Sequence, residues 1–154
     1  MVKKRLYLSL MLGVGLLLST ATNAEPLAAN NVIVRNPMVS LAATNNNQAS
    51  ISMVLNNKAE NTNYVIIAAT SSAAKQVQLG KTIRHGKNMK AVKEIIVDAD
   101  ASRTLQADDL HIALIGLKQQ LHAGDTVPVT LIFADGSYLD FRATVNKATI
   151  NRTN

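Results

Sequence analysis

The chain of 154 residues contains no cysteine. Disulfides are therefore excluded, and so are thiolate nucleophiles, redox-active cysteine pairs and blue-copper electron-transfer sites, which need a cysteine ligand. A lipid anchor attached through cysteine is excluded by the same absence. If the protein works in an oxidising compartment, its core has to hold together without covalent cross-links.

Glycine and aromatic residues are scarce, with 7 glycines in the chain and aromatics at 3% of it. The sequence has no phosphate-cradling glycine loop, and the signatures His-Glu-x-x-His and Gly-x-Ser-x-Gly are missing as well. The only adjacent carboxylate pair, Asp108-Asp109, stands at a turn before a predicted strand, where solvated aspartate is common. We therefore expect that the protein is not an enzyme.

One segment is strongly basic and carries Lys81, Arg84, Lys87, Lys90 and Lys93. Binding to single-stranded nucleic acid relies on aromatic side chains that stack with bases, and none lies near this segment. The segment is therefore interpreted as a solvated hairpin, and no nucleic acid is expected as a partner.

The first 24 residues have the pattern of a secretory signal peptide. Lys3-Lys4-Arg5 supplies the charge, Leu6 to Leu18 is apolar, and Thr22-Asn23-Ala24 offers small residues for cleavage. The apolar run is shorter than the roughly 20 residues that a membrane-spanning helix needs. Removing the leader takes away three of the 16 basic residues and none of the 10 acidic ones, which leaves a net charge of +3. We expect a mature protein that begins near Glu25, lies in the periplasm or is secreted, and does not insert into a membrane.

After the leader, residues 25–146 consist of short apolar stretches separated by turn signals, and residues 147–154 form a polar tail. Ala49 to Leu55 alternates cleanly, which predicts a strand with Met53 in the core. This pattern predicts a single all-β domain, a sandwich or barrel of about seven to nine strands. Thr44–Gln48 is expected to be a loop, and Pro128 is expected to mark an edge strand or a bulge. The other expected strands are Val32–Arg35 (resumed at Met38–Leu41 after Asn36-Pro37), Tyr64–Ala69, Gln76–Leu79, Glu94–Val97, Leu110–Leu117, Thr126–Phe133 and Tyr138–Val145.

The stretch Leu110–Leu117 is expected to be the central strand. In a strand, His111, Ala113 and Ile115 share one face while the intervening residues share the other. A buried imidazole on such an apolar strand needs a partner, which is either a backbone carbonyl or a metal.

Three residues are candidates for metal chemistry, namely His85, Met89 and His111. Thioether and imidazole donors together suit Cu(I), a soft ion. Each residue also has a structural interpretation: His85 as an exposed turn residue, Met89 as an adaptable core residue and His111 as a hydrogen-bonded strand histidine.

From Val32 to Val145, the sequence resembles the periplasmic copper chaperones called PCu(A)C. Two stretches that carry the resemblance are ASISMVLNN at 49–57 and AAKQVQL at 73–79. The most specific one is HIALIGLKQQL at 111–121, continued by GDTVPVTLIF at 124–133. The resemblance implies a cupredoxin-like β-sandwich of antiparallel strands. It also implies a protein that binds Cu(I) for delivery to a partner such as a respiratory oxidase in the membrane or another copper carrier.

In that family, Cu(I) is held by a His, a Met and a His-x-Met pair, with 21 residues between the first Met and the His of the pair. Met89 and His111 keep this spacing, so the resemblance implies that both are ligands. Ala113 stands where the second Met belongs and Gly80 where the first His belongs. Because the hairpin after Gly80 is about two residues shorter than in the family, His85 is a candidate substitute, and residue 80 is expected to be aimed away from the site.

These departures leave two hypotheses open. In the first, the protein is a copper-chaperone-like carrier that binds Cu(I) weakly through Met89, His111 and His85. In the second, it is a divergent accessory or binding protein that kept only the β-sandwich. The positive charge of Lys87, Lys90 and Lys93 around Met89 disfavours a bound cation and so supports the second hypothesis. The family's Met- and His-rich tail is missing too, since residues 148–154 contain neither residue type.

Overall fold

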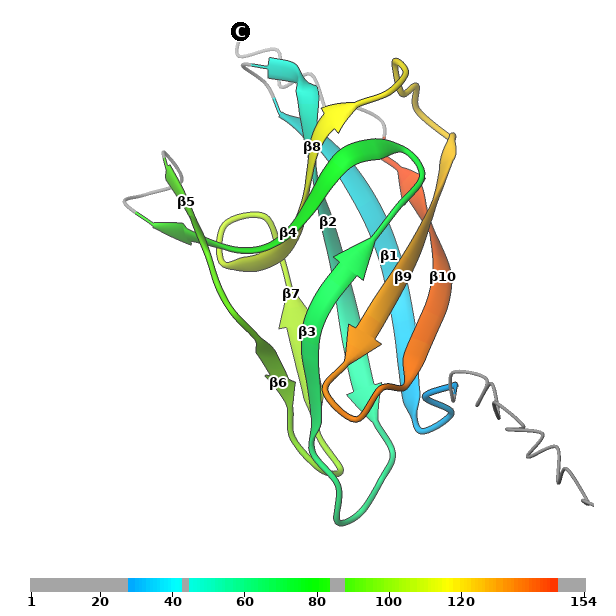
Figure 1. Cartoon of the computed structure of the whole chain (residues 1–154). Coiled ribbons are helices and arrows are strands. Elements are labelled where there is room, and N and C mark those ends of the chain that lie inside the picture. The colour runs from blue at the N-terminus through cyan, green and yellow to red at the C-terminus, as the bar shows by residue number, and fades with distance from the viewer. Residues whose placement is uncertain (1–27, 43–44, 84–87, 147–154) are drawn as a thin grey trace, which may run out of the picture.

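The computed structural model describes residues 28–42, 45–83 and 88–146. Within these ranges the chain forms ten strands and no helix (Figure 1). The strands are β1 Val32–Ala42, β2 Asn45–Asn57, β3 Tyr64–Thr70, β4 Ala74–Ile83, β5 Asn88–Ala91, β6 Ile95–Val97, β7 Ser102–Leu105, β8 Leu110–Leu117, β9 Thr126–Phe133 and β10 Tyr138–Val145.

All ten strands belong to one curled sheet. Its order is β5-β4-β8-β2-β1-β10-β9-β3-β6, and β7 pairs with the second half of β2, beyond the part that pairs with β8. Every pair is antiparallel except β1 with β10, which run parallel where the two ends of the domain meet. The all-β prediction is therefore confirmed. The strand number is higher than expected because the four-residue strands β5 and β7 add to the expected ones, whereas β6 lies within the expected strand Glu94–Val97. The pairing is mixed rather than purely antiparallel.

The core lies between the two halves of the curled sheet and is filled by the inward residues of alternating strands. In β2 the residues Ala49, Ile51, Met53 and Leu55 are all buried, as their alternation predicts. Tyr64 and Phe133 meet edge to face, with ring centroids 5.3 Å apart. Met53 is 3% exposed, so the prediction that it belongs to the core is confirmed.

Three local expectations had different outcomes. β1 is irregular between Arg35 and Met38, where Asn36 adopts a φ of 50°, so the predicted break is present. The expected loop at Thr44–Gln48 is wrong for the described part, because β2 already begins at Asn45 and pairs with both neighbours. Pro128 lies in β9, which is inside the sheet. The pairing of β9 with β3 ends at Thr130, so the missing N–H of Pro128 costs no hydrogen bond to β3.

Several predicted features fall outside the described residues. These are the leader at 1–24, the tail at 147–154 and the tip of the β4–β5 hairpin at 84–87, which contains His85. Among the residues that the structure describes, no helical segment has the length and hydropathy needed to cross a membrane.

Candidate functional site

His111 lies at the start of β8, which runs between β4 and β2. It is 3% exposed and stands directly opposite Gly80 of β4. The next residues, Ile112 and Leu114, point into the core and are fully buried, so His111 and Ala113 face the other side of the sheet. The predicted strand therefore has the predicted bounds and the predicted division of its faces.

One hydrogen bond fixes the tautomer of His111. Its Nδ1 lies 3.0 Å from the backbone carbonyl of Asp109. Because a carbonyl oxygen can only accept, Nδ1 must carry the proton, which leaves the lone pair on Nε2. A metal-binding histidine is typically held in this way, with one ring nitrogen donating to a carbonyl and the other one left for the metal.

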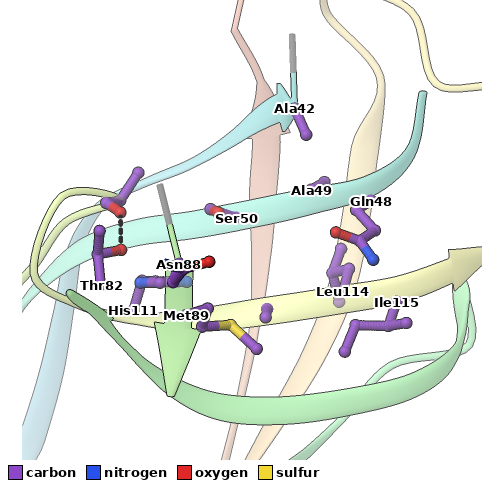
Figure 2. Close-up of a pocket in the computed structure, with 12 residues that line it drawn as sticks. Ala42, Gln48, Ala49, Ser50, Thr82, Asn88, Met89, His111, Leu114 and Ile115 are labelled. Carbon is purple, nitrogen blue, oxygen red and sulfur yellow. Dashed lines mark hydrogen bonds between the residues drawn. The ribbon is translucent and has the colours of Figure 1, made fainter. Parts of the chain in front are cut away.

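Thr82 of β4 holds that carbonyl in place. Its backbone N–H donates to the Asp109 carbonyl at 2.9 Å, and its hydroxyl donates to the Ala107 carbonyl at 2.6 Å (Figure 2). The turn before β8 is thus tied to β4 at two points. No sequence pattern indicates this role of Thr82, because the two bonds join residues about 25 positions apart.

Met89 of β5 lies beside His111. The contacts that a side chain at residue 80 would make show how close the two residues are. A Cβ atom on Gly80 would stand 2.7 Å from Met89 Sδ and 3.3 Å from His111 Nε2. Both potential donor atoms therefore lie around one point above Gly80. Figure 2 shows the side chains of His111 and Met89 near each other. Met89 is 38% exposed, so its side chain is partly open to solvent. The interpretation of Met89 as a core residue is excluded by this exposure.

The positions that lack the expected donors differ from each other. Residue 80 points directly at Met89 and His111, so the expectation that it is aimed away is wrong, and its space is occupied by the Met89 side chain. Ala113 instead borders a hollow of about 250 Å³ that His111 and Met89 also line. Ala113 stands between Gln78 of β4 and Ser50 of β2 in the sheet.

Lys90 is less unfavourable to a cation beside Met89 than the sequence suggested. Met89 pairs with Thr82, while its neighbour Lys90 pairs with Lys81. Because strand residues alternate, Lys81 and Lys90 point to the face opposite Met89. Lys81 also lies 3.9 Å from a carboxylate oxygen of Asp109. Lys87 is outside the described residues, and Lys93 is exposed after the end of β5.

The donor set restricts the metal. Among the described residues there is no group of three or more His, Cys, Asp or Glu that could hold a metal ion. Structural zinc, which takes four such ligands, and calcium, which takes six or more oxygens, do not fit here. One imidazole nitrogen and one thioether sulfur fit Cu(I).

Comparison with known proteins places the chain in a family. Residues 32–145 match the model of the family described as "Putative lipoprotein LpqE-like". The chain belongs to the LpqE-like family. Over 76 residues this LpqE-like chain is 40% identical to the "Putative lipoprotein Lxx21020" of Leifsonia xyli subsp. xyli (strain CTCB07), a match that spans 47% of this chain and 46% of the relative. The chain therefore covers less than half of that relative.

Solved structures similar to this LpqE-like chain include PCuAC domains. The copper-bound PCuAC domain from PmoF2 superposes with a TM-score of 0.64 at 17% identity, covering 77% of this chain and 95% of that domain. The solution structure of CuI-DR1885 from Deinococcus radiodurans gives a TM-score of 0.58 at 28% identity, covering 84% and 85% of the two chains. The predicted cupredoxin-like fold is thereby confirmed.

Proposed function

We propose that this protein binds Cu(I) as its cargo and acts as a copper-chaperone-like carrier outside the cytoplasm. The observation that carries the proposal is the convergence of Met89 Sδ and His111 Nε2 on one point above Gly80. Two of the similar solved structures are described as copper-bound or CuI forms. The family name and the curated relative both refer to lipoproteins, which supports an extracytoplasmic location and agrees with the leader-like residues 1–24.

In this proposal the two donors play different parts. His111 is buried and its ring is held by the Asp109 carbonyl, so Nε2 is the fixed donor. Met89 stands on the edge strand β5 and is 38% exposed, so its thioether is the donor that a partner can reach and replace. His85 lies in the same hairpin and is the candidate third ligand. A site with two firm donors holds Cu(I) weakly, which suits a protein that passes the ion to a copper-accepting oxidase or another carrier.

The proposal is tested by titrating the purified protein with Cu(I) against a competing chelator under anaerobic conditions. Since the chain has no cysteine, no thiol competes for the ion. Met89→Leu and His111→Ala should each lower the affinity at least tenfold, about 1.4 kcal/mol. Met53→Leu is the matched control, because Met53 is a buried core residue on another strand.

The alternative function is that of an accessory or binding protein without metal. It is favoured by the absence of donors at Gly80 and Ala113. Absence of measurable Cu(I) binding by the wild-type protein would support this alternative, whereas unchanged Cu(I) affinity in both Met89→Leu and His111→Ala would place the metal elsewhere. The same titration of His85→Ala decides whether the third ligand is real, because a true ligand would lower the affinity when it is removed.

A further inference from the structure

The hollow next to Ala113 is not filled by any described side chain. It has a volume of about 250 Å³ and is lined by twelve residues from β1, β2, β4, β5 and β8 and from the turn before β8. A closed core cavity of about 150 Å³ already admits a benzene-sized molecule. The hollow therefore has room for a small organic group immediately beside His111 and Met89 (Figure 2).

We propose that this hollow admits a neutral thioether from outside the chain, which completes the Cu(I) site at the place where Ala113 provides no donor. The inference rests on the proposed function, since it concerns the same ion. Binding would form one sulfur–copper bond by donation of a sulfur lone pair, so that no proton or electron is released and nothing is oxidised. The complete site would then contain His111 Nε2, Met89 Sδ and the external sulfur.

The lining favours an uncharged guest. Among the described residues of the hollow there is no Asp, Glu, Lys or Arg, and the only titratable side chain is that of His111. Alanines and Ile115 supply apolar wall, while Ser50, Thr82 and Asn88 offer hydroxyl and amide groups. A side chain with an apolar stem and a soft sulfur, such as that of methionine, matches these walls and the preference of Cu(I) for soft donors.

The surroundings of Gly80 and Ala113, the two positions without a metal donor, explain why the guest would enter beside Ala113 and not above Gly80. The space above Gly80 is taken by Met89, whose Sδ lies 2.7 Å from where a Cβ would stand. Ala113 is 5% exposed at the wall of the open hollow. An external donor at Ala113 therefore displaces no protein atom.

The test measures the Cu(I) affinity of the wild-type protein with and without N-acetylmethioninamide. For a guest that binds with a dissociation constant on the order of 1 mM, a concentration of about 10 mM should raise the apparent Cu(I) affinity about tenfold. N-acetylnorleucinamide, which has a methylene in place of sulfur, is the matched control and should have no effect. A pentapeptide with one central Met distinguishes the source: an equal gain assigns the donor to protein side chains, and a gain with the amide alone assigns it to free molecules.

Two variants locate the effect. Ala113→Leu fills the hollow without a donor and should abolish the gain, while Ala113→Met should bind Cu(I) more tightly and gain nothing from the amide. The inference is overturned if wild type binds Cu(I) but does not respond to the thioether, or if Ala113→Leu responds equally. Absence of Cu(I) binding by wild type in all conditions would instead refute the proposed function itself.

Discussion

Restoring one missing donor at a time tests how the structure distinguishes Ala113 from Gly80. Ala113→Met places a thioether on the same strand face as His111, two residues further along β8. Gly80→His places an imidazole on the facing residue of β4. Both changes restore a donor type that the resemblance to PCu(A)C proteins implies. From the sequence alone, Gly80→His is expected to do less because the shortened hairpin would aim residue 80 away, whereas the structure places that residue at the site.

The structure predicts unequal results. A Met at 113 extends toward a hollow of about 250 Å³ and not into a packed core. Its overpacking cost should therefore lie at the low end of the usual range of about 1–3 kcal/mol. A third donor should tighten Cu(I) binding at least tenfold, which is about 1.4 kcal/mol.

Gly80→His should gain less, although its side chain points at the site. Its Cβ alone would lie 2.7 Å from Met89 Sδ and 2.9 Å from Met89 Cγ, so Met89 has to move away. The new imidazole therefore displaces the Met89 thioether from the position in which it would bind Cu(I). Met89 is a flexible, partly exposed side chain on an edge strand, which allows the protein to fold despite this shift.

The assay is the anaerobic Cu(I) competition titration, accompanied by urea unfolding of each variant to show that it is folded. A folded Ala113→Met protein with wild-type affinity would show that His111 and Met89 do not form a metal site at this face. A larger gain for Gly80→His than for Ala113→Met would show that Met89 leaves the space above Gly80 freely, contrary to the packing described above.

Three further predictions concern positioning and stability. Thr82→Val removes the hydroxyl that holds the turn before His111, and should weaken Cu(I) binding roughly tenfold in the titration, in the range for outer-shell partners of a metal ligand. Asn57→Ala should lower the free energy of unfolding in urea by about 2–4 kcal/mol, because the buried Asn57 amide donates to three backbone carbonyls at 2.7, 3.2 and 3.0 Å. Hydrogen bonds from the hydroxyl and then the backbone N–H of Ser137 lower the pKa of Asp135 below its ordinary value of 3.8. Asp135 therefore contributes stability above pH 3.8 that is lost as the pH falls through its lower folded-state pKa, and Ser137→Ala should reduce this loss when urea midpoints are compared between about pH 5 and about pH 3.

Much of the fold could be predicted because strand alternation is a local property. The bounds of β8 and the inward face of β2 follow from the order of apolar residues over eight or so positions. The short strands β5 and β7 and the parallel pairing of β1 with β10 could not be predicted in this way, because they depend on which segments the curled sheet brings together. The start of β2 at Asn45 has the same cause, since the pairing of Asn45 with Ala42 of β1 and of Gln48 with Ile115 of β8 outweighs an asparagine-rich sequence that favours turns.

The donor types of the candidate site, the spacing of Met89 and His111, and the absence of donors at residues 80 and 113 follow from the amino-acid sequence alone. The folded structure is what brings these positions together, because the contact is made across β4, β5 and β8 by registers that no local pattern encodes. It also decided that the space above Gly80 is filled while the space beside Ala113 is open. Lys90, which is adjacent to Met89 in sequence, lies on the opposite face for the same reason: a strand sends neighbouring side chains in opposite directions, so charge that is near in the chain is not near in space.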